Sequence, residues 1–258
     1  MMKFNFYKYQ GTGNDFVMLD NSNGAFNALT NEQIQQISHR KFGIGCDGVI
    51  LVMPHAEHDF EMRYYNADGS RSFCGNGARA AVRFAEFLGL AKDECSFLAI
   101  DGVHTAKIFP NEIALAMSPV NEVSEIEGNY VCNTGSPHYI KFTEDAIDAV
   151  DIVAYGKEIR YNETYKQDGI NVNVANASTL EMLTYERGVE DETLSCGTGA
   201  TAVALAYAKK FEIEGKVALN LQVKGGLLQV AFERQGDAYS NIQLIGPAVE
   251  VFRGEYEL

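Results

Sequence analysis

Several features that would place this chain in a familiar class are missing from its sequence. Its 21 lysines and arginines are outnumbered by 35 aspartates and glutamates, which leaves a formal net charge of −14. So acidic a protein repels phosphate backbones, and we expect no nucleic-acid partner. The sequence also has no uninterrupted apolar run long enough to cross a bilayer, so we expect no membrane partner.

The sequence also lacks export and metal-binding signals. Its opening residues, MMKFNFYKYQGTGNDF, have neither the apolar core nor the cleavage site of a signal peptide, so the cytoplasm is the expected compartment. The five cysteines are odd in number, which argues against a disulfide framework. They include no C-x-x-C pair, so we expect no metal site. We interpret Cys46, Cys95 and Cys132 as small buried hydrophobes.

The chain nevertheless has the composition of an ordinary globular protein, because 46% of its 258 residues are hydrophobic. Short alternating segments predict many antiparallel strands, and residues 31–41 predict a helix with Thr30 as its N-cap. Lys224-Gly225-Gly226 predicts a hairpin turn. Many strands with few helices indicate the α+β class. A polar, acidic stretch after Pro119 suggests a boundary between domains 1–118 and 119–247.

An internal repeat is the most informative feature of the sequence. The pattern C-G-x-G-A-x-A occurs at residues 74–80 and again at residues 196–202, about half a chain length later. A strand led by tyrosine and a polar turn precede each copy. This spacing predicts two similar domains, each with a strand, a turn and a cysteine at the start of a helix. Such an arrangement would bring the two helices to a shared cleft.

The repeat suggests acid–base chemistry by thiols. A helix start offers free N–H groups and the positive end of a dipole, which stabilise a thiolate and can also bind a carboxylate. A thiolate and a thiol on opposite faces of one α-carbon could remove a proton from one face and return a proton to the other. A single glycine-flanked cysteine at a helix start is more often a packing feature. Two copies in matching contexts favour the chemical interpretation for Cys74 and Cys196.

Two other functions were considered from the sequence: a redox or binding role for the two cysteines stays open, and a dinucleotide site is rejected. Cys74 and Cys196 could instead form a switchable disulfide in a thiol-redox or small-molecule-binding protein. The segment GIGCDG matches G-x-G-x-x-G, but a dinucleotide site requires a strand before the motif and a helix after it. Here the predicted order is a helix and then a strand, so we reject a dinucleotide site.

The sequence resembles the diaminopimelate epimerase family along almost its whole length. The resemblance rests on an ordered series of segments: GTGNDF, RKFGIGCDG, NADGS with CGNGAR, GSPH, INVN, and YERG with CGTGA. It implies two pseudosymmetric, strand-rich, barrel-like domains, each around a central helix, with the active site between them. It allows residues 248–258 to return to the first domain. It further implies interconversion of L,L- and meso-2,6-diaminopimelate without pyridoxal phosphate, another cofactor or a metal.

The resemblance also implies the site residues. Cys74 and Cys196 resemble the acid/base pair, in which Cys74 protonates and Cys196 abstracts from the L,L isomer. His138 resembles a residue that supports the thiols and the substrate amine. Four groups of residues resemble substrate contacts. Asn14, Asn66 and Asn171 resemble contacts to the substrate side chain, and the pairs Gly75-Asn76 and Gly197-Thr198 resemble contacts to the reacting carboxylate. Glu186 resembles a contact to the amine, and Arg187 resembles the residue that binds the distal carboxylate.

Two positions depart from the family pattern and leave the substrate open. Ser136 stands where many members have asparagine, and Gly48 stands where some have glutamine. A related two-cysteine racemase with another amino-acid substrate is therefore an alternative to a diaminopimelate epimerase. Retention of Arg187 favours a substrate with a second carboxylate. The sequence leaves open a homodimer.

Overall fold

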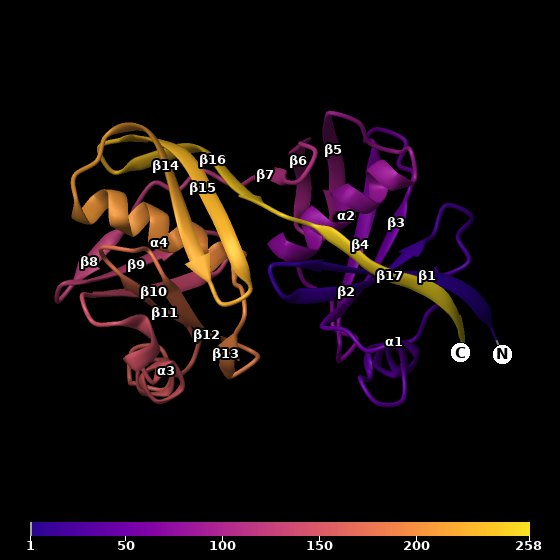
Figure 1. Ribbon diagram of the computed structural model, residues 1–258, viewed down its shortest axis with the longest axis horizontal. Helices are drawn as coiled ribbons and strands as arrows, with labels where there is room; N and C mark the ends of the chain where they lie inside the picture. Colours follow the sequence, from indigo (N-terminus) through magenta and orange to yellow (C-terminus); the bar gives the residue numbers. More distant parts are fainter. Residues whose placement is uncertain (1) are drawn as a thin grey trace. The chain divides into compact units, whose positions relative to one another are not determined.

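The computed structural model describes residues 2–258 and divides the chain into two compact units (Figure 1). Unit 1 contains the residues up to Leu115 together with Gly246–Leu258, and unit 2 contains Ala116–Ile245. The chain therefore leaves unit 1 once and returns to it for its last strand. The polar stretch after Pro119 belongs to unit 2, where Val120 and Val123 are buried in the core.

Unit 1 is built from strands that surround one central helix (Figure 1). Its sheet has the order β7-β6-β5-β4-β3-β2-β1-β17, with parallel pairing only at β2–β3 and β4–β5 among the described strands. The elements are β1 (Lys3–Gly11), β2 (Asn14–Asp20), α1 (Asn31–Ser38), β3 (Gly48–Met53), β4 (Phe60–Asn66), α2 (Gly75–Phe87), β5 (Glu94–Ala99), β6 (Gly102–Ile108), β7 (Ile113–Ala116) and β17 (Val249–Glu257).

Helix α2 lies in the middle of unit 1 because most of its surface is small and apolar. Ala78, Ala81 and Phe84 are fully buried, and the helix packs against β1, β2, β3, β4 and β6. Small side chains let the surrounding strands approach the helix backbone closely. The first turn of α2 is therefore held rigidly by the strands that carry Asn14 and Asn66.

Unit 2 repeats this plan with a second buried helix. One sheet has the order β13-β12-β11-β10-β9-β8, and β14, β15 and β16 pair in sequence. The elements are β8 (Ser124–Ile126), β9 (Asn129–Asn133), β10 (Pro137–Thr143), the 3-10 turn η1 (Ile147–Ala149), α3 (Ile152–Arg160), β11 (Asn171–Asn176), β12 (Met182–Glu186), β13 (Asp191–Thr193), α4 (Gly197–Lys210), β14 (Gly215–Val223), β15 (Gly226–Gln235) and β16 (Ala238–Gly246).

Helix α4 is apolar nearly all round, as its sequence predicts, and forms the core of unit 2. Val203 and Leu205 are fully buried and pack in one cluster with residues of β9, β10, β14 and β15. Because this cluster surrounds the helix, the position of the helix start at Gly197 is fixed by the whole unit.

Several local predictions are confirmed. Thr30 caps α1 in a capping box with Gln33, and Val223 pairs with Gly226 across the Lys224-Gly225 turn. GIGCDG lies between helix α1 and strand β3, the order that excludes a dinucleotide site.

Helix α3 has no counterpart in the sequence prediction, which assigned no element to residues 147–160. Asp151 caps it by accepting a hydrogen bond from the Ala154 N–H at 2.9 Å. The helix packs on β11 and β12, and Gly156 lies against Tyr185. A Cβ at position 156 would lie 2.4 Å from Tyr185 Cβ, so only glycine allows this approach. The contact supports the two strands that carry Asn171 and Glu186.

We predict that Gly156→Ala destabilises the protein, although alanine is the better helix former. Overpacking should outweigh the gain in helix propensity and lower the free energy of unfolding by about 1–2 kcal/mol. Urea titration followed by circular dichroism measures this change. The control, Lys157→Ala, alters an exposed residue of the same helix and should leave the unfolding midpoint nearly unchanged. A Gly156→Ala protein as stable as the wild type would contradict the packing argument.

Candidate active site

The two repeated cysteines are the N-caps of the two central helices. Cys74 precedes α2 with φ −134° and ψ 116°, and Cys196 precedes α4 with φ −120° and ψ 110°. In each helix the carbonyl of the cysteine accepts the first helical hydrogen bond, from Ala78 at 2.7 Å and from Ala200 at 2.9 Å. The repeat in the sequence therefore corresponds to a repeat in backbone geometry, with a sulfur beside the free N–H groups of each helix start.

In unit 1, Cys74 lies between a donor and an acceptor. Its Sγ accepts a hydrogen bond from the Gly77 N–H at 3.4 Å and donates one to Asn14 Oδ1 at 3.6 Å. Asn76 is buried and donates through Nδ2 to the same Asn14 oxygen at 3.3 Å. Unit 1 thus brings together three of the predicted site residues at the start of α2.

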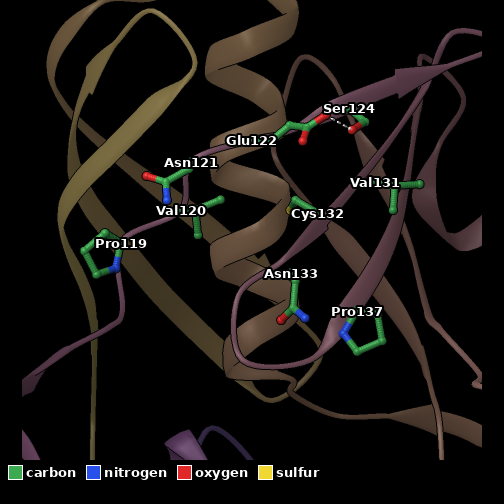
Figure 2. Close-up of a pocket in the computed structure, with 9 residues that line it drawn as sticks. All are labelled: Pro119, Val120, Asn121, Glu122, Ser124, Val131, Cys132, Asn133 and Pro137. Carbon is green, nitrogen blue, oxygen red and sulfur yellow. Dashed lines mark hydrogen bonds between the residues drawn. The ribbon is translucent and has the colours of Figure 1, made fainter.

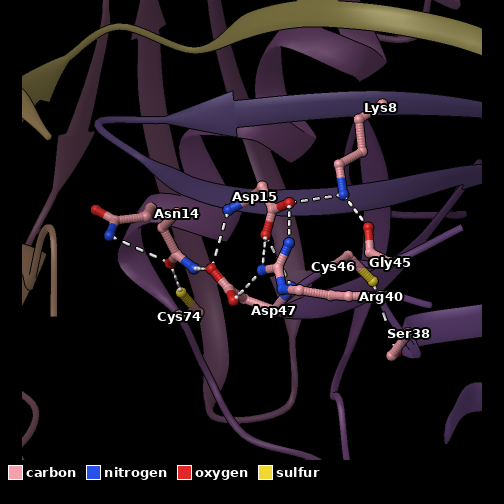
Figure 3. Close-up of polar contacts among 10 residues, drawn as sticks. Lys8, Asn14, Asp15, Ser38, Arg40, Gly45, Cys46, Asp47 and Cys74 are labelled. Carbon is pink, nitrogen blue, oxygen red and sulfur yellow. Dashed lines mark hydrogen bonds and ion pairs between the residues drawn. The ribbon is translucent and has the colours of Figure 1, made fainter. Parts of the chain in front are cut away.

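A chain of charged side chains fixes the orientation of Asn14 (Figure 3). Asn14 Nδ2 donates to Asp47 at 2.7 Å, so its oxygen faces Cys74. Arg40 lies 2.7 Å from carboxylate oxygens of both Asp47 and Asp15. Burial raises the pKa of Asp15, but hydrogen bonds from Arg40 and Lys8 outweigh it and lower that pKa to about 2. Neither Asp47 nor Arg40 was predicted as a site residue, although both lie in the segment RKFGIGCDG.

Asn66 lies at the end of β4 and holds the loop that leads to Cys74. Its Nδ2 donates to Ser70 Oγ at 3.0 Å and to Ser72 Oγ at 3.1 Å. These bonds support the local, structural role that asparagine often has in turns. They also connect Asn66 to the residue two positions before Cys74.

Gly48 is required by the packing of Tyr64. A Cβ at position 48 would lie 2.4 Å from the Tyr64 ring and 2.8 Å from its hydroxyl. No larger side chain fits at this position while the tyrosine keeps its place. The departure from the family pattern at Gly48 is therefore coupled to the aromatic residue on the neighbouring strand.

In unit 2, a chain of hydrogen bonds leads to Cys196. His138 is fully buried on β10, and its Nδ1 lies 3.1 Å from Asn173 Nδ2. Because the amide nitrogen must donate there, the His138 Nε2–H donates to Thr198 Oγ1 at 2.9 Å. The Thr198 hydroxyl proton is not used in that bond, so it is available to Cys196 Sγ, which lies 3.5 Å from Thr198 Oγ1. Asn173, which was not predicted, sets the tautomer of the histidine.

Burial keeps His138 neutral. Loss of solvation lowers its pKa to about 3, and the positive charge of Arg187 acts in the same direction. Gly199 makes room for the chain, because a Cβ there would lie 2.6 Å from Asn173 Oδ1 and 3.3 Å from Cys196 Sγ. The site next to Cys196 therefore consists of neutral donors.

A second cluster in unit 2 joins Asn171, Arg187 and Ser136. Asn171 Oδ1 accepts the Arg187 backbone N–H at 2.9 Å, and Asn171 Nδ2 donates to Ser136 Oγ at 2.8 Å. The Arg187 guanidinium donates to Ser136 Oγ at 3.3 Å and to the Asp168 carbonyl at 2.9 Å. The adjacent Glu186 accepts a hydrogen bond from the Thr193 hydroxyl at 3.0 Å. The guanidinium is exposed and held in one orientation by neutral groups, a suitable arrangement for binding a carboxylate.

The remaining cysteines differ from the capping pair. Cys46, Cys95 and Cys132 are buried, as predicted, and burial raises the pKa of each thiol, to about 12 for Cys95 and Cys132. A pocket in unit 2 is lined in part by Pro119, Cys132 and Pro137 (Figure 2). The lining residues include none of the predicted site residues.

Residues 2–258 contain neither a metal-binding cluster nor a membrane-spanning helix. No group of three or more histidine, cysteine, aspartate or glutamate side chains there could hold a metal ion. In the same range, no helix is both long and apolar enough to cross a membrane.

The chain is similar to curated proteins over nearly its whole length. The family model described as diaminopimelate epimerase matches residues 6–123 and 130–251. The diaminopimelate epimerase of Flavobacterium psychrophilum is 47% identical over 255 residues, which cover 95% of this chain and 97% of that protein. The diaminopimelate epimerase of Chlorobaculum tepidum is 38% identical over 96% of this chain and 99% of that protein.

Solved structures with lower identity share the fold. A phenazine biosynthesis protein of the PhzF family from Bacillus anthracis matches with a TM-score of 0.78 and 16% identity, covering 100% of both chains. A probable proline racemase from Agrobacterium radiobacter matches with a TM-score of 0.67 and 13% identity, covering 98% of this chain and 93% of that chain. These similarities confirm the predicted α+β class with two strand-rich domains. The sequence matches show, as the ordered motifs predicted, that this chain belongs to the diaminopimelate epimerase family.

Proposed function

We propose that this protein is a diaminopimelate epimerase in which Cys74 and Cys196 are the acid/base pair. The observation that carries the proposal is the recurrence of a cysteine N-cap with matching backbone angles at the start of both central helices. The family match covers both copies. The reaction interconverts L,L- and meso-2,6-diaminopimelate and, as the family resemblance implies, needs no cofactor.

The proposed reaction moves one proton off an α-carbon and another proton onto it. The Cys196 thiolate removes the α-proton of the L,L isomer, so the Cα–H bond breaks, an S–H bond forms, and the electron pair is delocalised into the carboxylate. The Cys74 S–H bond then breaks and its proton is added to the opposite face of the carbon. Cys74 is left as the thiolate and Cys196 as the thiol, so the next turnover from meso substrate uses them in reverse.

The hydrogen bonds beside each sulfur support this division of roles. Asn14 presents an oxygen to Cys74, which favours the protonated sulfur. The Thr198 hydroxyl is placed to donate to Cys196, and a hydrogen bond in that direction favours the thiolate. The N–H groups of the helix starts at Gly75-Asn76 and Gly197-Thr198 would stabilise the charge that develops on the reacting carboxylate.

The proposed substrate carries a second carboxylate, bound by Arg187. Ser136 and Asn171 orient this guanidinium and, with Asn66, would contact the distal end of the substrate. Glu186 would bind the amine. We further propose a cytoplasmic enzyme with a small-molecule partner and without nucleic-acid or membrane partners; a homodimer stays a prediction.

We predict that both thiols, Cys74 and Cys196, are required for epimerisation. Cys74→Ala or Cys196→Ala removes one proton-transfer group, and such groups contribute about 10²–10⁴-fold to rate, so the epimerisation rate should fall at least 100-fold. Circular dichroism or coupled assay of diaminopimelate inversion measures the rate. Cys95→Ala, which alters a buried thiol outside the site, is the matched control. Near wild-type rates in both variants would exclude the assigned pair.

We predict that Arg187→Met weakens binding of diaminopimelate. Loss of a charge-assisted hydrogen bond costs about 1.5–3 kcal/mol, so KM should rise roughly 10–100-fold while kcat changes less. Free lysine offered as a substrate lacks the distal carboxylate, so its α-proton exchange should show no comparable loss in the variant. Lys166→Met removes an exposed cation of unit 2 and is the control. An unchanged KM for diaminopimelate, with exchange of another amino acid, would favour a racemase of different specificity.

We predict that neutral His138 makes the protein less stable in acid. The pKa of a histidine in the unfolded chain is about 6.5, against about 3 in the folded protein. The contribution of neutral His138 to the free energy of unfolding is fully present above pH 6.5. It falls by up to about 1.4 kcal/mol per pH unit as the pH decreases toward 3. Urea unfolding should show that the free energy of unfolding falls less between pH 7 and pH 5 in His138→Asn than in wild type. The exposed His39→Asn variant is the control, and an equal pH dependence in His138→Asn would show that His138 is not the group responsible.

A further inference from the structure

Arg79 is a buried cation that the mechanism above does not use. It lies in the second turn of unit 1's central helix and is 0% exposed. Its Nη2 donates to Thr12 Oγ1 at 3.5 Å, while Nε and Nη1 have no acceptor in the described part of the chain. Among the ion pairs of residues 2–258, none involves Arg79. A buried charge without a counter-ion is costly, so its presence needs an explanation.

The guanidinium lies beside the turn that contacts Cys74. Side chains of an α-helix lean toward its N-terminus, and Arg79 is five residues after the cap. A Cβ on Gly11 would lie 3.4 Å from Arg79 Nη2 and 3.5 Å from the Asn76 carbonyl oxygen. Arg79 therefore adjoins the β1–β2 turn whose Asn14 touches the Cys74 sulfur.

The thiolate form of Cys74 acts electrostatically on Arg79. Burial lowers the pKa of Arg79 to about 10, and the charge of the Cys74 thiolate acts in the opposite direction. The attraction is reciprocal, so the cation must also stabilise the thiolate.

The other charged groups around α2 are compensated. On β1 and β2 and in the loop before β3, two cations alternate with two carboxylates in the chain Lys8, Asp15, Arg40 and Asp47. On β6, His104 stacks on Phe73 and pairs with Asp101 at 2.8 Å. Burial raises the pKa of Tyr9 on β1 to about 12, so it is neutral, and the Tyr64 phenol on β4 lies against Gly48. Among the described residues at this helix start, Arg79 is thus the buried cation without a carboxylate.

The internal repeat supplies a comparison within the same chain. The position equivalent to Arg79 in the second copy is Thr201, a neutral residue whose hydroxyl donates to the Gly197 carbonyl at 3.0 Å. The two copies match in cysteine, glycines and backbone angles, but only the first has a buried cation. Cys74 also faces the Asn14 oxygen, which favours its protonated form, whereas Cys196 faces a hydroxyl donor.

We propose that Arg79 is a positioning residue that stabilises the thiolate left on Cys74 after Cys74 delivers its proton. This stabilisation offsets the preference for the thiol that the Asn14 oxygen creates. The inference rests on the proposed function for its catalytic meaning. Without the cation, Asn14 would hold the proton on Cys74, and the thiol would ionise only at higher pH.

The first test measures the ionisation of Cys74 directly. In a Cys196→Ala background, the rate of iodoacetamide alkylation of Cys74 is followed against pH, with the modified peptide identified by mass spectrometry. A nearby opposite charge shifts a pKa by about 1–3 units, so Arg79→Met should raise the midpoint by about one pH unit or more. Arg79→Lys, which keeps the charge, should stay near the parent value.

The outcomes separate this inference from the proposed function. The matched control is Thr201→Val in a Cys74→Ala background, where the midpoint for Cys196 should not move. An unchanged Cys74 midpoint in Arg79→Met, or an equal rise in Arg79→Lys, would overturn the inference. Alkylation requires no turnover, so a shifted midpoint would support the role of Arg79 even if diaminopimelate were not the substrate.

The second test leaves Arg79 in place, so it does not depend on an arginine variant that folds. Aspartate and asparagine are nearly isosteric and cap helices equally well. At pH 7, Cys74→Asp should have a higher Tm than Cys74→Asn, because its carboxylate pairs with the buried cation. The same two substitutions at Cys196 control for the helix dipole and should differ less. An Asp–Asn difference in Tm that is no larger at position 74 than at position 196 would contradict the proposal.

Discussion

The free N–H groups at the starts of two buried helices are the feature on which the rest of this structure depends. Each helix is surrounded by the strands of its own unit, so its first turn is held firmly with the cap cysteine beside the free N–H groups. A cysteine at that cap experiences the helix dipole and local hydrogen bonds, both of which change the balance between thiol and thiolate. The two copies share this backbone but differ in what faces the sulfur, an amide oxygen for Cys74 and a hydroxyl for Cys196. In the proposed mechanism, this common geometry gives the two sulfurs complementary roles.

Much of the fold could be predicted because its signals are local. Alternating strands, the Thr30 N-cap and the Lys224-Gly225 turn each depend on a few neighbouring residues. The apolar sequence of α4 also predicted its burial correctly. Helix α3 was missed because its interior glycine is unfavourable in a helix and is explained only by the Tyr185 ring, which comes from a distant strand.

The repeat indicated both cysteines, but the groups that orient them are distant in sequence. Asp47 and Arg40 act on Cys74 through Asn14, and Asn173 acts on Cys196 through His138 and Thr198. Such chains depend on side chains from several strands, which spacing alone does not bring together. The same holds for Gly48, whose departure from the family pattern is explained by the position of Tyr64. Arg79 lies inside the quoted motif CGNGAR, yet only its burial without a carboxylate sets it apart.

The central claim is that two different groups handle the proton on the two faces of one carbon. The most direct test is to start the reaction with L,L-diaminopimelate in deuterium oxide and analyse both isomers at low conversion by NMR or mass spectrometry. The account predicts that the meso product carries deuterium at the inverted centre while the recovered L,L substrate still carries protium, because the group that removes the proton does not return it. Deuterium appearing in recovered substrate as fast as in product would indicate a single base and would contradict the account.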